Sequence, residues 1–103
     1  MTGRNFVRPT LSVGDNVADF MLEYQIKAPT LAKMLGIPRS RLQRLLDGAR
    51  CDGDMALRLS RVFPPTSPQY WMNMQSTHDI SSAQAMRGEA IIEETTPLEA
   101  PAA

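Results

Sequence analysis

Apolar residues recur along the chain at the spacing of helix faces. Val17, Phe20, Met21 and Tyr24 stand at positions i, i+3, i+4 and i+7, which is the stripe of an amphipathic helix. Four segments further along the chain repeat this kind of pattern, and no alternating Val/Ile/Thr run of useful length indicates a strand. The pattern predicts an all-α protein built from five helices.

Prolines, glycines and capping residues mark where these helices begin and end. Ser12 or Asp15 can cap the first helix, and Thr66-Ser67-Pro68 can open a fifth helix with Trp71 and Met74 on its inner face. The helices between them follow the rule that proline suits a first turn and glycine a C-terminal cap. We expect them to begin near Pro29, Pro38 and Asp52-Gly53, and to end at Gly36, Gly48 and Pro64-Pro65.

The charge of the chain is uneven although it sums to zero. Residues 28–61 carry seven basic and three acidic side chains, a net charge of +4, and residues 62–103 carry one basic and five acidic ones, a net charge of −4. We therefore divide the chain into an N-terminal arm (1–11), a helical domain (12–84) and an acidic, partly mobile tail (85–103). The basic middle favours an anionic partner, although arginines that only solvate helix faces are the plainer alternative.

Residues 28–47 have the spacing of a helix-turn-helix. Ala32 supplies the tiny side chain where two helices cross at a steep angle, Gly36 can take positive φ in the turn, and Leu42 plugs the angle between the helices. Short helical hairpins without a nucleic-acid role can imitate this spacing. The outer face of the second helix therefore decides whether the motif binds DNA.

That outer face is polar and basic. The first turns of the second helix point at base edges in the major groove, where arginine can donate two hydrogen bonds to guanine. The helix holds no acid before Asp47, whereas a purely structural helix more often balances its arginines. We therefore predict contacts to double-stranded DNA from Arg39, Ser40, Arg41, Gln43 and Arg44, and to its phosphate backbone from Arg50.

The composition argues against several other classes of protein. A single cysteine excludes an internal disulfide, and one histidine with one cysteine cannot form a zinc finger. No apolar run approaches the ~20 residues that cross a bilayer. We expect a cytoplasmic protein that is not an enzyme and has no metal, no small-molecule cofactor and no membrane partner.

Two further segments carry a resemblance to a known family. Residues 55–63 (MALRLSRVF) and 66–75 (TSPQYWMNMQ) are similar to the signature that follows the helix-turn-helix in HigA-type antitoxins, which are Xre-like proteins. The resemblance covers about residues 8–80. It implies a five-helix lambda-repressor-like fold, a homodimer on palindromic operator DNA, repression of its own operon, and neutralisation of a HigB/RelE-like mRNA endonuclease toxin.

The chain departs from this family's pattern at DNA-contacting positions. Lys27-Ala28 stands where the family has Ser-Gln, so the expected contact either weakens or passes to Lys27 and Thr30, and Ala49 replaces a basic residue. Two alternatives stay open: a solitary Xre-type regulator without a toxin, and an interaction adaptor whose helix-turn-helix no longer binds DNA. For the homodimer we predict a seam in the fifth helix around Tyr70, Trp71 and Met74.

Overall fold

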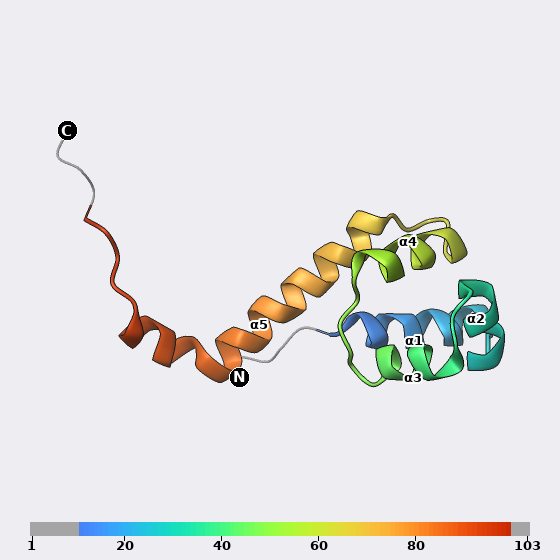
Figure 1. Cartoon of the computed structure of the whole chain (residues 1–103), viewed down its shortest axis with the longest axis horizontal. Helices are drawn as coiled ribbons and strands as arrows, with labels where there is room; N and C mark the ends of the chain where they lie inside the picture. Colours follow the sequence, from blue (N-terminus) through green and yellow to red (C-terminus); the bar gives the residue numbers. More distant parts are fainter. Residues whose placement is uncertain (1–10, 100–103) are drawn as a thin grey trace.

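Five helices and no strand make up residues 11–99, the part of the chain that the computed structural model describes. They are α1 (Val13–Tyr24), α2 (Ala28–Leu35), α3 (Arg39–Leu46), α4 (Gly53–Val62) and α5 (Pro68–Glu94). Figure 1 shows α1 to α4 gathered into one body, with α5 beginning beside α4 and running away from it. The predicted all-α fold is confirmed, while the arm before Leu11 and residues 100–103 of the predicted tail lie outside the described residues.

Side-chain caps account for the starts of three helices. The Ser12 hydroxyl accepts from the Asp15 N–H at 3.1 Å while the Asp15 carboxylate accepts from the Ser12 N–H at 3.1 Å, which is a capping box. Asp52 caps α4 and Ser67 caps α5 through their side-chain oxygens. These are the boundaries that the capping pattern predicts.

The turn between α2 and α3 is sharp and depends on Gly36. This residue has φ 71° and ψ 34°, the left-handed conformation that glycine adopts without steric penalty. The Ile37 N–H then donates to the Ala32 carbonyl at 3.0 Å and closes the end of α2. Ala32 and Leu42 are 2% and 1% exposed, so both belong to the core beneath the two helices.

An aromatic cluster joins α1 and α5 with Phe63, at the end of α4. The rings of Phe20, Phe63 and Trp71 have centroids 4.9–6.3 Å apart, and the Trp71 indole N–H donates to the Thr66 hydroxyl at 2.9 Å. Trp71 is 0% exposed. The prediction that Trp71 belongs to a dimer seam is therefore wrong, because its ring fills the core of one chain and presents no surface to a second copy.

Helices α1 and α3 approach closely at Gly14. A Cβ atom on this residue would lie 1.9 Å from the carbonyl oxygen of Leu45 and 3.0 Å from the Cα atom of Leu46. Only a residue without a side chain fits there, so Gly14 sets how closely α1 lies behind α3. The spacing of residues around Gly14 in the sequence does not indicate this role.

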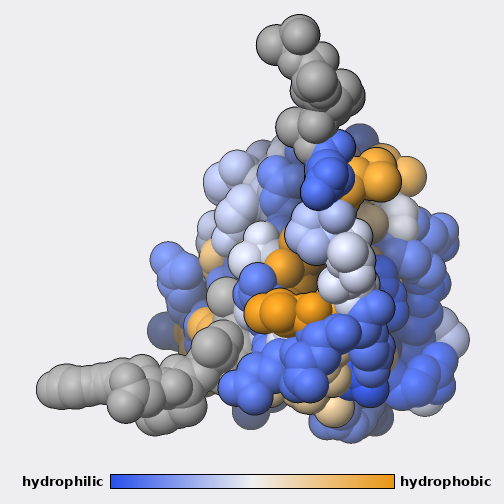
Figure 2. All heavy atoms as spheres, turned by 90° about the vertical axis from the view of Figure 1, so that its left-hand side faces the viewer, coloured by the Kyte–Doolittle hydropathy of each residue, from blue (hydrophilic) through white to orange (hydrophobic). Residues whose placement is uncertain are grey.

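Helix α5 is longer than the sequence pattern predicts. It continues through Glu94, so residues 85–94, which we placed in the tail, are helical. The first proline after Pro68 is Pro97, and a helix that has already formed propagates easily until such a residue stops it. The far half of α5 carries exposed apolar side chains, and Figure 2, which views the molecule from this end, shows apolar patches among hydrophilic ones.

Candidate nucleic-acid interface

Helix α3 has one buried face and one exposed face. Leu42 and Leu45 are 1% and 2% exposed and pack into the core. Ser40, Gln43 and Arg44 are exposed, and they share a face because residues three and four apart are neighbours on a helix. Since α3 follows α2 through a tight turn, this exposed face has the position of the surface that a helix-turn-helix places in the major groove.

Two arginines of α3 are exposed and form no ion pair within residues 11–99, namely Arg39 and Arg44. Gln43 lies between them in sequence, and its amide donates to the Asp47 carboxylate at 3.0 Å. Guanidinium and amide groups are the side-chain groups that pair with guanine and adenine edges. The exposed face of α3 therefore carries hydrogen-bonding groups suited to base recognition.

Arg41 is held by α4 and does not join that face. Its guanidinium lies 2.8 Å from the Asp54 carboxylate and 3.7 Å from the Asp52 carboxylate, and its side chain is 30% exposed. The contact between Arg41 and DNA stays a prediction, and it would require this guanidinium to leave the Asp54 carboxylate. The two acids that pair with Arg41 lie at the start of α4. The pattern of charges within α3 therefore could not indicate them, although Asp52 and Asp54 follow only 11 and 13 residues later in the sequence.

Arg58 ties the same carboxylate to the turn of the helix-turn-helix. Its Nε donates to Asp54 at 2.7 Å, and its NH1 group donates to the carbonyl oxygens of Leu35 at 2.9 Å and Gly36 at 3.3 Å. Hydrogen bonds from Arg58 and Arg41 lower the pKa of Asp54, and Asp54 in turn raises the pKa of Arg58. We had assigned Arg58 no role, although its place four residues after Asp54 was a usable signal.

Arg50, predicted to contact the DNA backbone, forms an ion pair with Asp79 of α5. Asp79 also accepts from the Gln75 amide at 2.9 Å, and the Gln75 side-chain oxygen accepts from the Cys51 N–H at 2.7 Å. The hydrogen bond from Arg50 is the main reason why the pKa of Asp79 is lowered. A phosphate that binds Arg50 must therefore compete with Asp79.

The start of α2 has backbone donors that no side chain caps. Lys27 occupies the capping position without a side-chain hydrogen bond, and Pro29 lies in the first turn. Thr30 is exposed in that turn. The first N–H groups of a helix that lack side-chain partners are suited to bind a phosphate, so the departure at Lys27-Ala28 leaves this end of α2 open to an anion.

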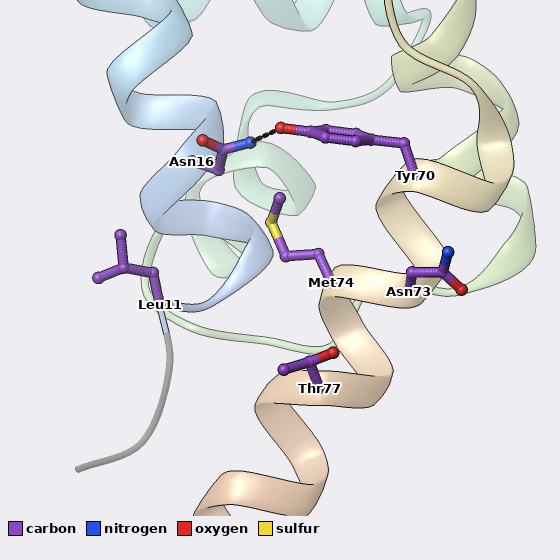
Figure 3. Close-up of a pocket in the computed structure, with 6 residues that line it drawn as sticks. All are labelled: Leu11, Asn16, Tyr70, Asn73, Met74 and Thr77. Atoms are coloured by element: carbon purple, nitrogen blue, oxygen red, sulfur yellow. Dashed lines mark hydrogen bonds between the residues drawn. The ribbon is translucent and has the colours of Figure 1, made fainter.

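Tyr70 and Met74 lie at a hollow between α1 and α5 instead of in the core with Trp71. The hollow has a volume of about 480 Å³, and the Asn16 amide donates across it to the Tyr70 hydroxyl at 2.8 Å. Figure 3 shows Met74 pointing toward α1 beneath this hydrogen bond. Its lining consists of Leu11, Asn16, Tyr70, Asn73, Met74 and Thr77.

Three further features concern chemistry other than DNA binding. Within residues 11–99, no group of three His, Cys, Asp or Glu side chains could hold a metal ion, and none of the helices is long and apolar enough to cross a membrane. Cys51 is fully buried, and burial raises the pKa of its thiol to about 11. A thiol with so high a pKa is a poor nucleophile near neutral pH.

Similar solved structures share both the fold and the order of helices. The chain is 33% identical to the antitoxin HigA of Pseudomonas aeruginosa, solved with the higBA promoter, with a TM-score of 0.82 over 89% of this chain and 100% of that one. A HigA-family addiction module antidote protein from Coxiella burnetii is 33% identical, with a TM-score of 0.81 over 88% and 100%. The antitoxin GraA in complex with its operator is 31% identical, with a TM-score of 0.82 over 95% and 99%.

The fold and the exposed face of α3 define a helix-turn-helix protein of the lambda-repressor type. The chain belongs to the HigA antitoxin family. This confirms the resemblance carried by residues 55–63 and 66–75. No protein-family model matches the chain. Among curated proteins it is 33% identical over 51 residues to virulence-associated protein A' of Dichelobacter nodosus, and it spans 44% of the length of that relative.

Proposed function

We propose that this protein is the antitoxin of a type II toxin–antitoxin module. It binds operator DNA of its own operon as a homodimer, represses transcription, and neutralises a HigB/RelE-like mRNA endonuclease in the cytoplasm. The observation that carries the DNA-binding part is the exposed face of α3, directly after the helix-turn-helix turn. Two of the similar structures were solved with DNA, and membership of the HigA family supports the antitoxin part.

In this mechanism α3 of each protomer enters the major groove. Arg44 and Gln43 donate to base edges, and Arg39 lies beside them at the start of the helix. The uncapped N–H groups of α2 and the Thr30 hydroxyl bind a backbone phosphate, which fixes the register without reading sequence. The protein acts by binding alone and catalyses no reaction.

A DNA-binding assay with paired variants tests this placement. The probe is the DNA upstream of the gene, compared with a duplex of shuffled sequence. Arg44→Ala should weaken binding to each half-site by about 5- to 150-fold, because a bidentate arginine–guanine pair is worth about 1–3 kcal/mol. The dimer loses two such pairs, so its affinity for the operator should fall by about 30-fold or more. The control is Arg61→Ala, which removes an exposed arginine of α4 that has no ion pair within residues 11–99. Equal effects of both variants would rule out α3 as the reading helix.

The far half of α5 is the surface that we propose for the homodimer, in place of the seam around Trp71. A groove with a volume of about 580 Å³ lies along this half of the helix. Ile91 and Ile92, which line the groove, are 42% and 74% exposed. Such apolar side chains lower the free energy when a second copy covers them. Helix α5 is about 40 Å long. Two copies that pair through the far ends of this helix therefore keep their α3 helices well separated. Such a separation is needed for binding in successive major grooves, which lie about 34–36 Å apart.

The oligomeric state can be measured by sedimentation velocity. Ile91→Glu places a charge in the proposed seam and should convert a dimer into monomers. Leu57→Glu is the matched control, because Leu57 is also an exposed apolar residue (60%) but lies on α4. A wild-type monomer, or a dimer that survives Ile91→Glu, would exclude this seam.

The antitoxin part is tested by co-expression. The small reading frame next to this gene is expressed alone and then together with this protein. Growth arrest that co-expression relieves, with co-purification of the two proteins, is the expected result. A harmless neighbour that does not bind would instead favour the solitary Xre-type regulator.

A further inference from the structure

A single carboxylate, that of Asp54, connects α3 to α4. One of its oxygens accepts from Arg41 of α3 at 2.8 Å and from Arg58 of its own helix at 2.7 Å. The three side chains are 30–54% exposed, so the contact lies at the surface, beside the proposed DNA interface. The second acid near Arg41, Asp52, is more distant at 3.7 Å and caps α4.

The position of Arg41 on α3 makes this contact matter for DNA. At 100° per residue, Arg41 lies on the flank of the helix, between the exposed face at Ser40 and Arg44 and the buried face at Leu42 and Leu45. An arginine side chain on that flank is long enough to swing toward a bound phosphate backbone once no carboxylate holds it. The ion pair with Asp54 therefore keeps Arg41 away from such a phosphate.

The turn of the helix-turn-helix has support that does not come from Asp54. Arg58 donates directly to the carbonyl oxygens of Leu35 and Gly36, and Gly36 supplies the backbone conformation that the turn requires. The ion pairs of Asp54 are exposed, and exposed ion pairs contribute little to folding. The main effect of Asp54 is on the direction in which Arg41 points, because the other carboxylate near this guanidinium, that of Asp52, is more distant at 3.7 Å.

We propose that Asp54 is a specificity-determining residue of the DNA interface, because it holds the Arg41 guanidinium against α4 and withholds one cation from phosphates. Phosphate binding by Arg41 would strengthen binding to every DNA sequence equally and would lower the preference for the operator. Asp54 is a positioning residue and need not touch DNA. The proposal rests on the proposed function, namely sequence-specific DNA binding through α3.

The variant Asp54→Asn tests the proposal through salt dependence. Each protomer of the dimer would release one Arg41 to a phosphate, so the plot of log affinity against log salt should steepen by about 1.8 for random-sequence DNA. The gain in affinity for that DNA should therefore be about 12-fold larger at 50 mM than at 200 mM salt. The ratio of operator affinity to random-sequence affinity should fall in parallel. The operator probe is the best duplex that the wild-type protein selects from a randomised pool.

Two further variants separate this effect from a simple change of charge. Asp52→Asn removes the same charge beside Arg41 and keeps an α4 cap, because asparagine caps as well as aspartate, but it leaves the 2.8 Å contact in place. It should steepen the salt dependence less than Asp54→Asn does. In the double variant Asp54→Asn/Arg41→Gln, the additional salt dependence should disappear, because the released cation is gone.

The outcomes are distinct. An unchanged salt slope in Asp54→Asn, or a gain that persists without Arg41, overturns the proposal while the proposed function stands. A wild-type protein that binds operator and random DNA alike overturns both. Circular dichroism of every variant reports folding, and Asp54→Ser carries the same test if the asparagine variant unfolds.

Discussion

Gly14→Ala tests the packing of α1 behind the proposed DNA-reading helix. The added Cβ would meet the Leu45 carbonyl oxygen at 1.9 Å and the Leu45 carbonyl carbon at 2.8 Å, both of them backbone atoms of α3. Carbon–oxygen contacts normally lie near 3.3 Å or beyond, so the helices must separate by about 1.4 Å at this point. Val13 and Val17, which are 0% exposed on either side of Gly14 in α1, would be drawn out of the core by that movement.

The expected loss of stability follows from two opposing effects. Overpacking a well-packed core costs about 1–3 kcal/mol, and a rigid backbone neighbour places this site at the upper end. Alanine favours the helix over glycine by about 1 kcal/mol at most, which offsets part of the loss. The net destabilisation should be about 2 kcal/mol, which corresponds to a fall in Tm of about 8–16 °C for a domain of this size.

Thermal unfolding of two glycine variants provides the assay. Gly53 also lies in the first turn of a helix, α4, but a Cβ on it would meet no atom within 4 Å. Gly53→Ala should therefore leave Tm unchanged or raise it slightly. Both variants are compared at one protein concentration, because self-association makes Tm depend on concentration. A Gly14→Ala protein as stable as Gly53→Ala would refute the close approach of α1 and α3.

Two further predictions concern the contact between Cys51 and α5. Gln75→Leu removes the acceptor of the buried Cys51 N–H and should lower the free energy of unfolding, measured in urea, by about 1–3 kcal/mol. Gln69→Leu, on the exposed side of α5, should leave this free energy unchanged. Equal effects of the two variants would contradict the buried hydrogen bond. Because burial raises the pKa of the Cys51 thiol to about 11 from an ordinary 9.0, iodoacetamide should modify the folded protein far more slowly than the urea-unfolded one at pH 8. The stability linked to the protonated thiol is present in full below about pH 9 and is lost as the pH rises toward 11, and Cys51→Ser should abolish this alkaline loss.

Local signals in the sequence were enough to predict five helices and most of their boundaries, although not the end of α5. The predicted boundaries depend on residues that act on their own neighbours: Ser12 and Asp15 cap each other, Gly36 takes the left-handed conformation, and Ser67 caps α5. Such effects operate over three or four residues, so a pattern read along the chain captures them. The exposed face of α3 followed in the same way, from helical periodicity alone.

Contacts between distant helices escaped the same reasoning. Arg41 and Arg50 were expected to be unpaired, yet their carboxylate partners lie 13 and 29 residues further along the chain. Trp71 was expected on the inner face of its helix and in a dimer seam, but it packs against the rings of Phe20 and Phe63 within one chain. These pairings depend on how the helices pack in three dimensions, so the pattern of any single helix does not predict them.

The ion pairs also reduce the number of unpaired cations that the basic middle of the chain offers to DNA. Of the cations on α3, only Arg39 and Arg44 form no ion pair within residues 11–99, so a dimer presents four such arginines to DNA. Four cations that lie among the phosphates, whether they bond to a phosphate or to a base edge, should displace counterions as four neutralised phosphates would and give a salt slope of about −3.6 for duplex DNA. If Arg41 and Arg50 also left their carboxylates on binding, the slope would approach about −7, because each dimer would gain four more contacts. The measured slope therefore reports whether the ion pairs of Arg41 and Arg50 are kept in the complex with DNA. Asp54 can maintain the preference for the operator only if its ion pair with Arg41 is kept.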